Sequence, residues 1–404
     1  MMSVATFDAD LIIAGAGCAG LSALWQVMHG HNEHRNVIVI DRNFEVGDDR
    51  TWAFWGPRDA PFAHLAKRNW NQVKVRFPGW ETVGRLRTGS GTSQSGERLY
   101  HCVRQRDYDA SILGEAAGRP NIRFVAQDII SLRDDHDGGV VELPEGELRA
   151  PLVLQSTQLS PSDSDSRVRH PLRQHFGGWE VRTQFPIFDP HVATLMDFDT
   201  DQLGSTAFFY VLPEAPNRAL VELTMFSLQP RDRTFYDAQI RQHLDRLGAG
   251  DVSIDRTEYG IIPMDDRHRG QQWGQHVWNV GTVGGMTKPT SGYTFQRIHS
   301  QARHLISHWA NGTTPSPVPQ PPARYRFADR TLLNILHHHP VHGRTIFERL
   351  FTNTSIDDVL TFLDEDSTLG NDARMAAKLP WAPFLRASAA EIGAGLATAI
   401  TSQP

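Results

Sequence analysis

A glycine-rich turn near the start of the chain constrains the fold most. Residues 10–41 read DLIIAGAGCAGLSALWQVMHGHNEHRNVIVID. The uncharged apolar run 11–14 predicts a strand buried on both faces. The pattern G-x-G-x-x-G follows it, at Gly15, Gly17 and Gly20. The first glycine permits a tight turn, the second lets backbone N–H groups approach a pyrophosphate, and the third lets the next helix pack against the strand.

A helix and a second strand complete this unit. Residues 21–28 continue as a helix whose positive N-terminal end would face the phosphate. The second strand, residues 37–40, ends at Asp41, 21 positions after Gly20. A carboxylate at this distance accepts the ribose hydroxyls and repels a 2′-phosphate. The pattern alone leaves FAD, NAD and a turn without a nucleotide as alternatives; the expected cofactor-binding residues are Gly15, Gly17, Ala19, Gly20, Asp41 and Arg42.

Composition bounds the class of protein. The 404 residues predict two domains or one large composite domain, and 40% hydrophobic with 21% charged residues describes a globular chain with a real core. The net charge of −6 gives no signal for nucleic-acid binding. Cys18 and Cys102 are the two cysteines of the chain, and a disulfide at Cys18 would disrupt the glycine turn, so a reducing cytoplasm is expected.

Two features invite other interpretations that we do not favour. The apolar run 11–25 follows acidic residues and is shorter than the ~20 residues that a membrane-spanning helix needs. The histidine run 337–339 precedes Pro340 and lacks a nearby cysteine or a second spaced histidine with a carboxylate. We therefore predict a helix C-terminus there and no metal site.

A second glycine-rich stretch, GTVGGMTKPTSGYTF at residues 281–295, follows another predicted strand. Small residues between a strand and a helix form a nest of N–H groups that binds anions. We expect the next helix to begin near Thr290 or Ser291. An ordinary loop-to-helix junction is the alternative, and Lys288 could equally be solvated. The residues expected to bind the cofactor here are Gly281, Gly284, Gly285 and Met286.

Residues 179–227 show a β pattern that predicts a substrate-binding sheet between the nucleotide-binding segments. Within ALVELTMF at 219–226, period-two alternation places Glu222 on one face with Leu220, Thr224 and Phe226. Both faces are largely apolar, so the carboxyl should be desolvated and its pKa raised toward that of a useful proton donor. A buried glutamate paired with arginine or backbone donors, or an edge-strand glutamate in water, is an equally good account.

Further residues are candidates for the substrate pocket. Aromatic faces can stabilise a cation, although core packing explains any single aromatic residue as well. The connector 312–322 is rich in proline, and the chain beyond it is helical, with Ser355 capping residues 356–363. The pocket candidates are Trp52, Phe54, Trp55, Thr224, Lys288 and Tyr293.

The chain resembles the lycopene cyclases of the bacterial and plant flavoprotein type. The TKPTSGYTF and FYVLP…ALVE pieces are specific, whereas the glycine turn alone is not. The acidic motif departs from the plant members, which carry a Glu pair where this chain has Glu222 alone, and Gln155-Ser156 stands where relatives often show an acid or Asn beside Ser. The matching stretches are DLIIAGAGCAGLS (10–22), DRTWAFW (49–55), QHFGGWEV (174–181), ATLMDF (193–198), FFYVLP…ALVELTMFS (208–227), YGIIPM (259–264), GTVGGMTKPTSGYTFQRI (281–298) and RTIFERLF…VLTFLDEDSTL (344–369).

The resemblance implies an α/β fold: a Rossmann-like FAD-binding domain of the p-hydroxybenzoate-hydroxylase-like, GR2 type, with an inserted β-sheet substrate domain and C-terminal helices. It implies an intramolecular lyase of the isomerase class that closes the linear ends of lycopene into β-rings, with reduced FAD, NAD(P)H as reductant and Glu222 as proton donor, proton acceptor or cation stabiliser. It also implies peripheral attachment to the cytoplasmic face of the inner membrane, with residues 392–400 and the C-terminal helices as candidates. The expected divisions are 1–75, 120–160 and 257–312 for FAD binding, 76–119 and 161–256 for substrate binding, and 323–404 for the helical segment.

Other functions compete with this one. An FAD- and NAD(P)H-dependent monooxygenase of the same fold, acting on an aromatic or terpenoid substrate, would share the cofactor segments. A non-catalytic carotenoid- or flavin-binding protein would be favoured by a water-exposed Glu222. A cyclase acting on another prenyl chain is a third alternative.

Overall fold

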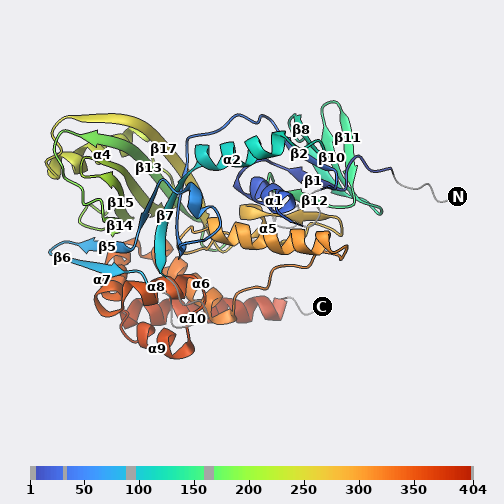
Figure 1. The fold of residues 1–404 in the computed structure, drawn as a ribbon. Coiled ribbons are helices and arrows are strands. Elements are labelled where there is room, and N and C mark those ends of the chain that lie inside the picture. The colour runs from blue at the N-terminus through green and yellow to red at the C-terminus, as the bar shows by residue number, and fades with distance from the viewer. Residues whose placement is uncertain (1–5, 31–33, 88–96, 159–167, 402–404) are drawn as a thin grey trace.

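The computed structural model describes residues 6–30, 34–87, 97–158 and 168–401 (Figure 1). Figure 1 shows a region around a parallel sheet, a second region around a larger sheet, and a layer of C-terminal helices beneath both. The first region holds the segments predicted to bind a nucleotide, and we call it the nucleotide-binding region. The mixed α/β architecture predicted from the sequence is confirmed.

The parallel sheet is built from short, mostly apolar strands, and apolar clusters cover both of its faces. Its strand order is β18-β12-β1-β2-β8. The predicted strand–turn–helix–strand unit is present, with helix α1 (Cys18–Met28) between β1 and β2. The strands are β1 (Leu11–Ala14), β2 (Val37–Asp41), β8 (Ile122–Ala126), β12 (Val153–Gln155) and β18 (Val277–Asn279).

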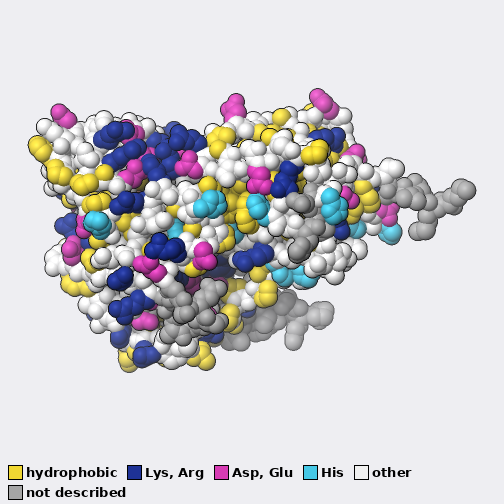
Figure 2. Space-filling model, viewed as in Figure 1, with side chains coloured by type: hydrophobic (Ala, Val, Ile, Leu, Met, Phe, Trp, Pro, Cys, Tyr) yellow, Lys and Arg dark blue, Asp and Glu magenta, His cyan; other side chains and the backbone are white. Residues whose placement is uncertain are grey.

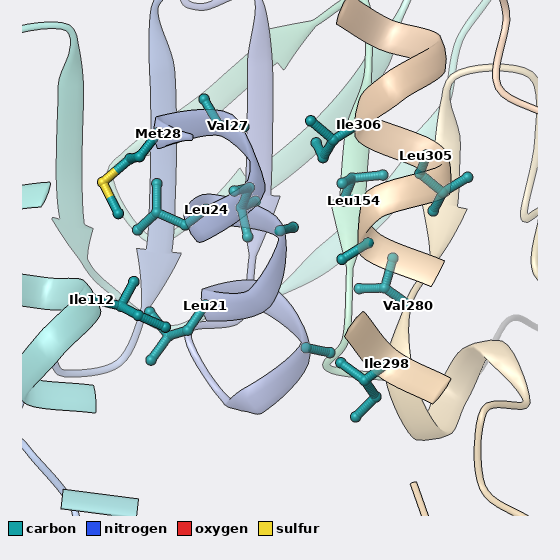
Figure 3. Packing of buried hydrophobic residues seen from close by; sticks show 14 of the residues in the cluster. Leu21, Leu24, Val27, Met28, Ile112, Leu154, Val280, Ile298, Leu305 and Ile306 are labelled. Atoms are coloured by element: carbon teal, nitrogen blue, oxygen red, sulfur yellow. The ribbon is translucent and has the colours of Figure 1, made fainter. Parts of the chain in front are cut away.

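Helices α2 (Gln105–Ala117) and α5 (Phe295–Ala310) pack on either side of α1. Figure 3 shows Leu21 and Leu24 of α1 in the same apolar cluster as Ile112 of α2 and Leu305 of α5. Helix α5 begins four or five residues later than the sequence predicted. Residues 288–292 instead form a tight turn, in which the N–H groups of Ser291 and Gly292 donate to the carbonyl of Lys288.

The larger sheet has the strand order β17-β13-β16-β15-β14-β5-β6. It is antiparallel except for the β14–β5 pair. Helix α4 (Arg233–Arg246) covers one face, and the other face looks toward β3, β7 and the C-terminal helices. The strands are β5 (Gln72–Phe77), β6 (Trp80–Arg85), β13 (Leu172–Thr183), β14 (Val192–Asp197), β15 (Thr206–Ala215), β16 (Arg218–Ser227) and β17 (Val252–Met264).

This sheet takes in more of the chain than the ranges assigned to substrate binding from the sequence. It includes β5 and the whole of β17, whereas α2 packs in the nucleotide-binding region. Two small sheets complete the fold, with orders β3-β7-β4 and β11-β10-β9. Their strands are β3 (Thr51–Pro57), β4 (Arg68–Trp70), β7 (Arg98–Arg104), β9 (Ser131–Asp134), β10 (Gly139–Leu143) and β11 (Gly146–Ala150).

The C-terminal helices follow the proline-rich connector, as predicted. The Ser355 side chain caps α8 by accepting from the N–H of Asp358 at 3.1 Å. Among the described residues, no helix combines the length and the apolar character needed to cross a bilayer. The helices are α6 (Ala323–His338), α7 (Gly343–Asn353), α8 (Ile356–Leu363), α9 (Leu369–Ala376) and α10 (Trp381–Thr401).

A buried lysine joins this helical layer to the nucleotide-binding region. Lys288 is 1% exposed, and its Nζ donates to Asp329 Oδ2 of α6 at 2.8 Å and to Glu365 Oε1 at 2.9 Å. Thr290 adds a bond to the other oxygen of Asp329, also at 2.8 Å. Removing one partner of a buried ion pair lowers stability strongly, because the remaining charge is then buried without compensation.

We expect Lys288→Met to lower the free energy of unfolding by about 3–5 kcal/mol, because it leaves two carboxylates facing each other in a buried site. Chemical denaturation measures this change. Lys378→Met is the matched control, since Lys378 is exposed and should change stability by less than ~0.5 kcal/mol. Equal stabilities of the two variants would show that the Lys288 pairs do not hold the layers together.

Candidate active site

The first glycine turn leaves the N-terminus of α1 open at Gly17. Gly15 has a φ of +105°, which L side chains rarely adopt. A Cβ on Gly20 would overlap the carbonyl oxygen of Gly15, so this glycine is needed for helix–strand packing. A Cβ on Gly17 would meet nothing within 4 Å, so the N-terminus of α1 faces open space here. That opening is where a phosphate group can approach the backbone.

Asp41 lies beside this opening, at the carboxyl end of β2. Its Oδ2 accepts a hydrogen bond from the N–H of Ala16, in the glycine turn, at 2.7 Å. The neighbouring Arg42 is exposed. The carboxylate is thus fixed at the edge of the sheet, where a ribose would lie next to the pyrophosphate.

The second glycine turn meets the first. Gly281 has a φ of +72°, and a Cβ there would lie 2.7 Å from the Cβ of Ala19 in α1. Gln301 of α5 fixes the turn by accepting from the N–H of Gly281 at 2.9 Å. Gly285 has a φ of +78°, while Gly284 and Met286 are buried. The residues predicted from two distant stretches therefore lie side by side at the carboxyl ends of the parallel strands.

The segment 286–295 continues from this turn to the larger sheet. A Cβ on Gly292 would lie 2.6 Å from Gln174 Oε1 of β13 and 3.4 Å from Ile262 of β17. The ring of Tyr293 packs edge-on against Trp55 at 4.3 Å between centroids. This segment therefore links the glycine turns to one face of the seven-stranded sheet.

Glu222 of β16 is on that face. Leu220 and Phe226 belong to the apolar cluster that includes Trp55, whereas Val221 belongs to the cluster under α4, as the alternation predicted. The Glu222 side chain is partly buried, and Thr224, which is fully buried, donates to its Oε1 at 2.6 Å.

Glu258 of β17 is a second carboxyl at this site, and our sequence analysis missed it. Glu222 and Glu258 both pair in register with Gly178 of β13, one from each side. A Cβ on Gly178 would lie 3.3 Å from Glu222 Cβ and 3.3 Å from Glu258 Oε1. The two acids therefore lean toward each other over a residue without a side chain.

Their environments differ. Glu258 Oε2 accepts from Arg256 at 2.8 Å and from Thr51 at 2.8 Å, so its carboxylate has a cation and a hydroxyl as partners. Burial raises the pKa of Glu222 well above its usual value, and the charge of Glu258 and a hydrogen bond to it act in the same direction. The Thr224 hydrogen bond and the charge of Arg256 oppose this shift without cancelling it. Glu222 is thus the member that holds a proton.

An ion cluster lies one position further along the same face. Glu180 pairs with Arg256, Arg104 and Arg218 at 2.9–3.6 Å and also with Lys67. Burial alone would raise the pKa of Glu180, but the hydrogen bond from Lys67 and the positive charges of Lys67 and Arg104 lower it to about 2. This cluster fixes Arg256, which in turn holds Glu258.

The aromatic candidates divide between two environments. Trp52 and Phe54 stack on Phe295, at 5.4 and 4.9 Å, in the core of the nucleotide-binding region. Trp55 points to the opposite side of β3, toward the sheet, and its Nε1 donates to Asp364 at 2.8 Å. Of the three, Trp55 is the one in the cluster shared with the Glu222 face.

Two further tyrosines contact Tyr293. Tyr210 of β15 pairs in register with Glu222, and its hydroxyl interacts with that of Tyr293. Tyr100 of β7 also interacts with Tyr293. Burial, followed by the neighbouring tyrosine and Glu222, raises the pKa of Tyr210 well above its usual value, so these hydroxyls stay neutral.

The histidine run ends α6, as predicted. His337 packs against His170, with the two Nδ1 atoms 3.4 Å apart, and His170 Nε2 is 2.9 Å from Glu391 Oε1 of α10. These contacts hold α6 and α10 against the start of β13, away from the Glu222 face.

A family model described as lycopene cyclase protein matches residues 10–389, nearly the whole chain. The chain belongs to the lycopene cyclase family. It is 27% identical over 298 residues to the lycopene beta-cyclase of Paracoccus sp. (strain N81106 / MBIC 01143), a match that covers 70% of each chain. It is 25% identical over 300 residues to the lycopene beta-cyclase of Pantoea ananas, again over 70% of each.

Solved structures with a similar fold have names that indicate other activities. A probable FAD-dependent monooxygenase from Pseudomonas aeruginosa gives a TM-score of 0.55 at 16% identity over 84% of this chain and 99% of its own. A geranylgeranyl bacteriochlorophyll reductase-like protein from Thermoplasma acidophilum gives 0.57 at 11% identity over 94% and 95%. The family member described here therefore has the p-hydroxybenzoate-hydroxylase-like fold of the GR2 type.

Gly17 and Gly20 of the first turn provide a matched test of the nucleotide site. We expect Gly17→Ala to keep the melting temperature but to lower FAD affinity, because its methyl group would enter the open space where phosphate approaches. Gly20→Ala should instead destabilise the fold, because its methyl group overlaps the Gly15 carbonyl. Differential scanning fluorimetry and flavin titration separate the two effects. If Gly17→Ala binds FAD like the unchanged protein, the pyrophosphate is bound elsewhere.

Proposed function

We propose that this lycopene cyclase family enzyme closes the linear ends of lycopene into β-rings without net oxidation or reduction. The observation that carries this proposal is the position of Glu222: a carboxyl with a raised pKa beside the apolar side chains of Leu220 and Phe226, bordered by the segment that continues from the second glycine turn. Both relatives named above are lycopene beta-cyclases.

We propose that FAD is the cofactor and that the two glycine turns hold it. Gly17 and the N-terminus of α1 would bind the pyrophosphate, and Asp41 the ribose. The turn at Gly281 and Gly285 would receive the part of the cofactor nearest the sheet. When bound and reduced by NAD(P)H, FAD would supply negative charge near a developing cation, without net electron transfer.

Glu222 would start the reaction. Its proton is added to C2 of the terminal C1=C2 bond, which leaves a tertiary cation at C1. The C5=C6 bond then attacks C1, which closes the six-membered ring and moves the cation to C5. Loss of the C6 proton gives the β-ring. Thr224, which donates to Glu222 Oε1, orients the carboxyl and leaves its other oxygen for the proton.

The surrounding aromatic residues would protect the cation. Trp55 and Tyr293 present ring surfaces next to the Glu222 face, and aromatic faces attract positive charge. Their packing also excludes water, which would otherwise capture the cation. The raised pKa of Tyr210 keeps its hydroxyl neutral, so it adds polarity without a competing base.

We further propose that the protein docks peripherally on the cytoplasmic face of the inner membrane, because a long polyene is nearly insoluble in water. Trp381, Leu385 and Ile392 are 72%, 64% and 56% exposed. Their spacing of four and seven residues places them on one side of α10. Lys378 lies exposed just before this helix and Arg386 lies exposed on it, where both can attract anionic lipid headgroups. Figure 2 shows hydrophobic side chains at the lower edge of the molecule, over the C-terminal helices.

The decisive test is Glu222→Gln. We expect cyclisation to fall by roughly 10²–10⁴-fold, because the general acid is lost, while flavin binding is kept. Pigment chromatography from a lycopene-accumulating bacterial host measures the product, and flavin absorbance measures cofactor binding. A product one oxygen heavier than lycopene would instead indicate a monooxygenase, and a normal rate in the variant would exclude Glu222 as the acid.

Membrane docking is tested with Trp381→Ser combined with Leu385→Ser. We expect less of this variant to sediment with vesicles of phosphatidylglycerol and phosphatidylcholine, because it loses two exposed apolar anchors. Ile130→Ser is the matched control, since Ile130 is also 56% exposed but lies far from α10 in the nucleotide-binding region. Equal sedimentation of both variants and the unchanged protein would place the membrane contact elsewhere.

A further inference from the structure

A carboxyl pair at the centre of the sheet face carries an inference that rests on the proposed cyclisation and deepens it. Glu222 and Glu258 lie on strands that are not neighbours, because β13 runs between β16 and β17. Side chains two strands apart have Cα atoms about 10 Å from each other. They meet here because Gly178, the residue that pairs with both, leaves the space between them free.

The partners of each acid assign it a different proton state. Glu258 Oε2 accepts from a cation and a hydroxyl donor, Arg256 and Thr51, at 2.8 Å each. Arg256 is itself held by Glu180 at 3.3 Å and donates to the Asp48 carbonyl, so it cannot turn away easily. Glu222 faces Thr224 and the tyrosines and lies next to a negative charge. Two close carboxyls in this setting share one proton, as like charges cannot both be accommodated.

We propose that Glu258 is the second catalytic residue, the base that removes the C6 proton after Glu222 has protonated C2. In the closed ring, C2 and C6 are both bonded to C1, so the carbon that gains a proton and the carbon that loses one are next-nearest neighbours. Two carboxyls leaning toward each other can therefore serve both carbons.

The two carboxyls end the reaction in the protonation states in which they began it. Glu222 loses its proton to C2 and becomes a carboxylate. The Glu258 carboxylate takes the proton from C6, and the electron pair of that C–H bond forms the C5=C6 double bond. The proton then passes from Glu258 to Glu222 through the hydrogen bond between them, which restores the starting state. No oxidant or reductant is consumed.

The first test is Glu258→Gln, assayed with reduced FAD and lycopene in liposomes across pH. We expect a fall in rate of at least ~10²-fold, because the base is lost. We also expect the remaining activity to fall off at a lower pH on the alkaline side of its pH profile, which we call the alkaline limb. The charge of Glu258 raises the pKa of Glu222, so removing that charge lets Glu222 lose its proton at a lower pH. Glu258→Asp keeps the charge and should recover part of the rate.

Two further variants distinguish catalysis from structure. Glu147→Gln removes a carboxylate that pairs with Arg133 at 2.6 Å in the separate β11-β10-β9 sheet, so it leaves the partners of Glu222 and Glu258 in place. It should leave both rate and pH limb unchanged. Gly178→Ala keeps both acids but places a methyl group between them, and it should lower the rate and shift the limb in the same direction as Glu258→Gln.

The outcomes separate this inference from the proposed function. A Glu258→Gln variant that binds flavin and cyclises normally, or that slows with an unchanged pH limb, overturns the role of Glu258 as base. If Glu258→Gln loses flavin, Gly178→Ala decides, and a normal rate and limb in that variant overturn the pair. A wild-type protein that does not cyclise lycopene at all overturns the proposed function instead.

Discussion

The site depends on the close approach of two acidic side chains across a glycine. Adjacent antiparallel strands fix which residues stand opposite one another, and here the register sets Gly178 between Glu222 and Glu258. Without Glu222, Glu258 would only be the ion-pair partner of Arg256. Without Glu258, Glu222 would only be a polar residue beside apolar ones. Held together, they become a pair that shares a proton, which is the property that acid–base chemistry needs.

The rest of the structure keeps this pair in place and away from water. The ion cluster around Glu180 fixes Arg256, and Arg256 fixes Glu258. The segment 286–295 covers the same face and is anchored at its base by Lys288, whose buried ion pairs reach into the C-terminal helices. The helical layer therefore contributes to the site indirectly: it holds the segment that carries Tyr293 against the sheet.

Much of the candidate site could be predicted from the sequence, because the patterns that indicate it lie within short stretches of the chain. The glycine turn, the acid at the end of the next strand and the alternation around Glu222 each depend on residues within a few positions of one another. The structure placed Gly281 against Ala19, and it set Leu220 and Val221 on opposite faces of β16. Lys288 could be solvated or buried on the sequence evidence, since a lone lysine carries no local sign of its partners. No local pattern could show that β17 joins the larger sheet, because it does so by pairing with β13, about 80 residues earlier.

Local signals in the sequence predict the strand–turn–helix–strand unit, the class of fold and one catalytic candidate, because strand and helix periods and turn chemistry act over short stretches of chain. The position of Glu258 beside Glu222, the direction in which Trp55 rather than Trp52 faces the sheet, and the burial of Lys288 instead follow from contacts between distant segments. These facts depend on the register between strands and on the packing of distant segments. Strand register depends on the burial of a whole strand face, so no single residue of the sequence reveals it.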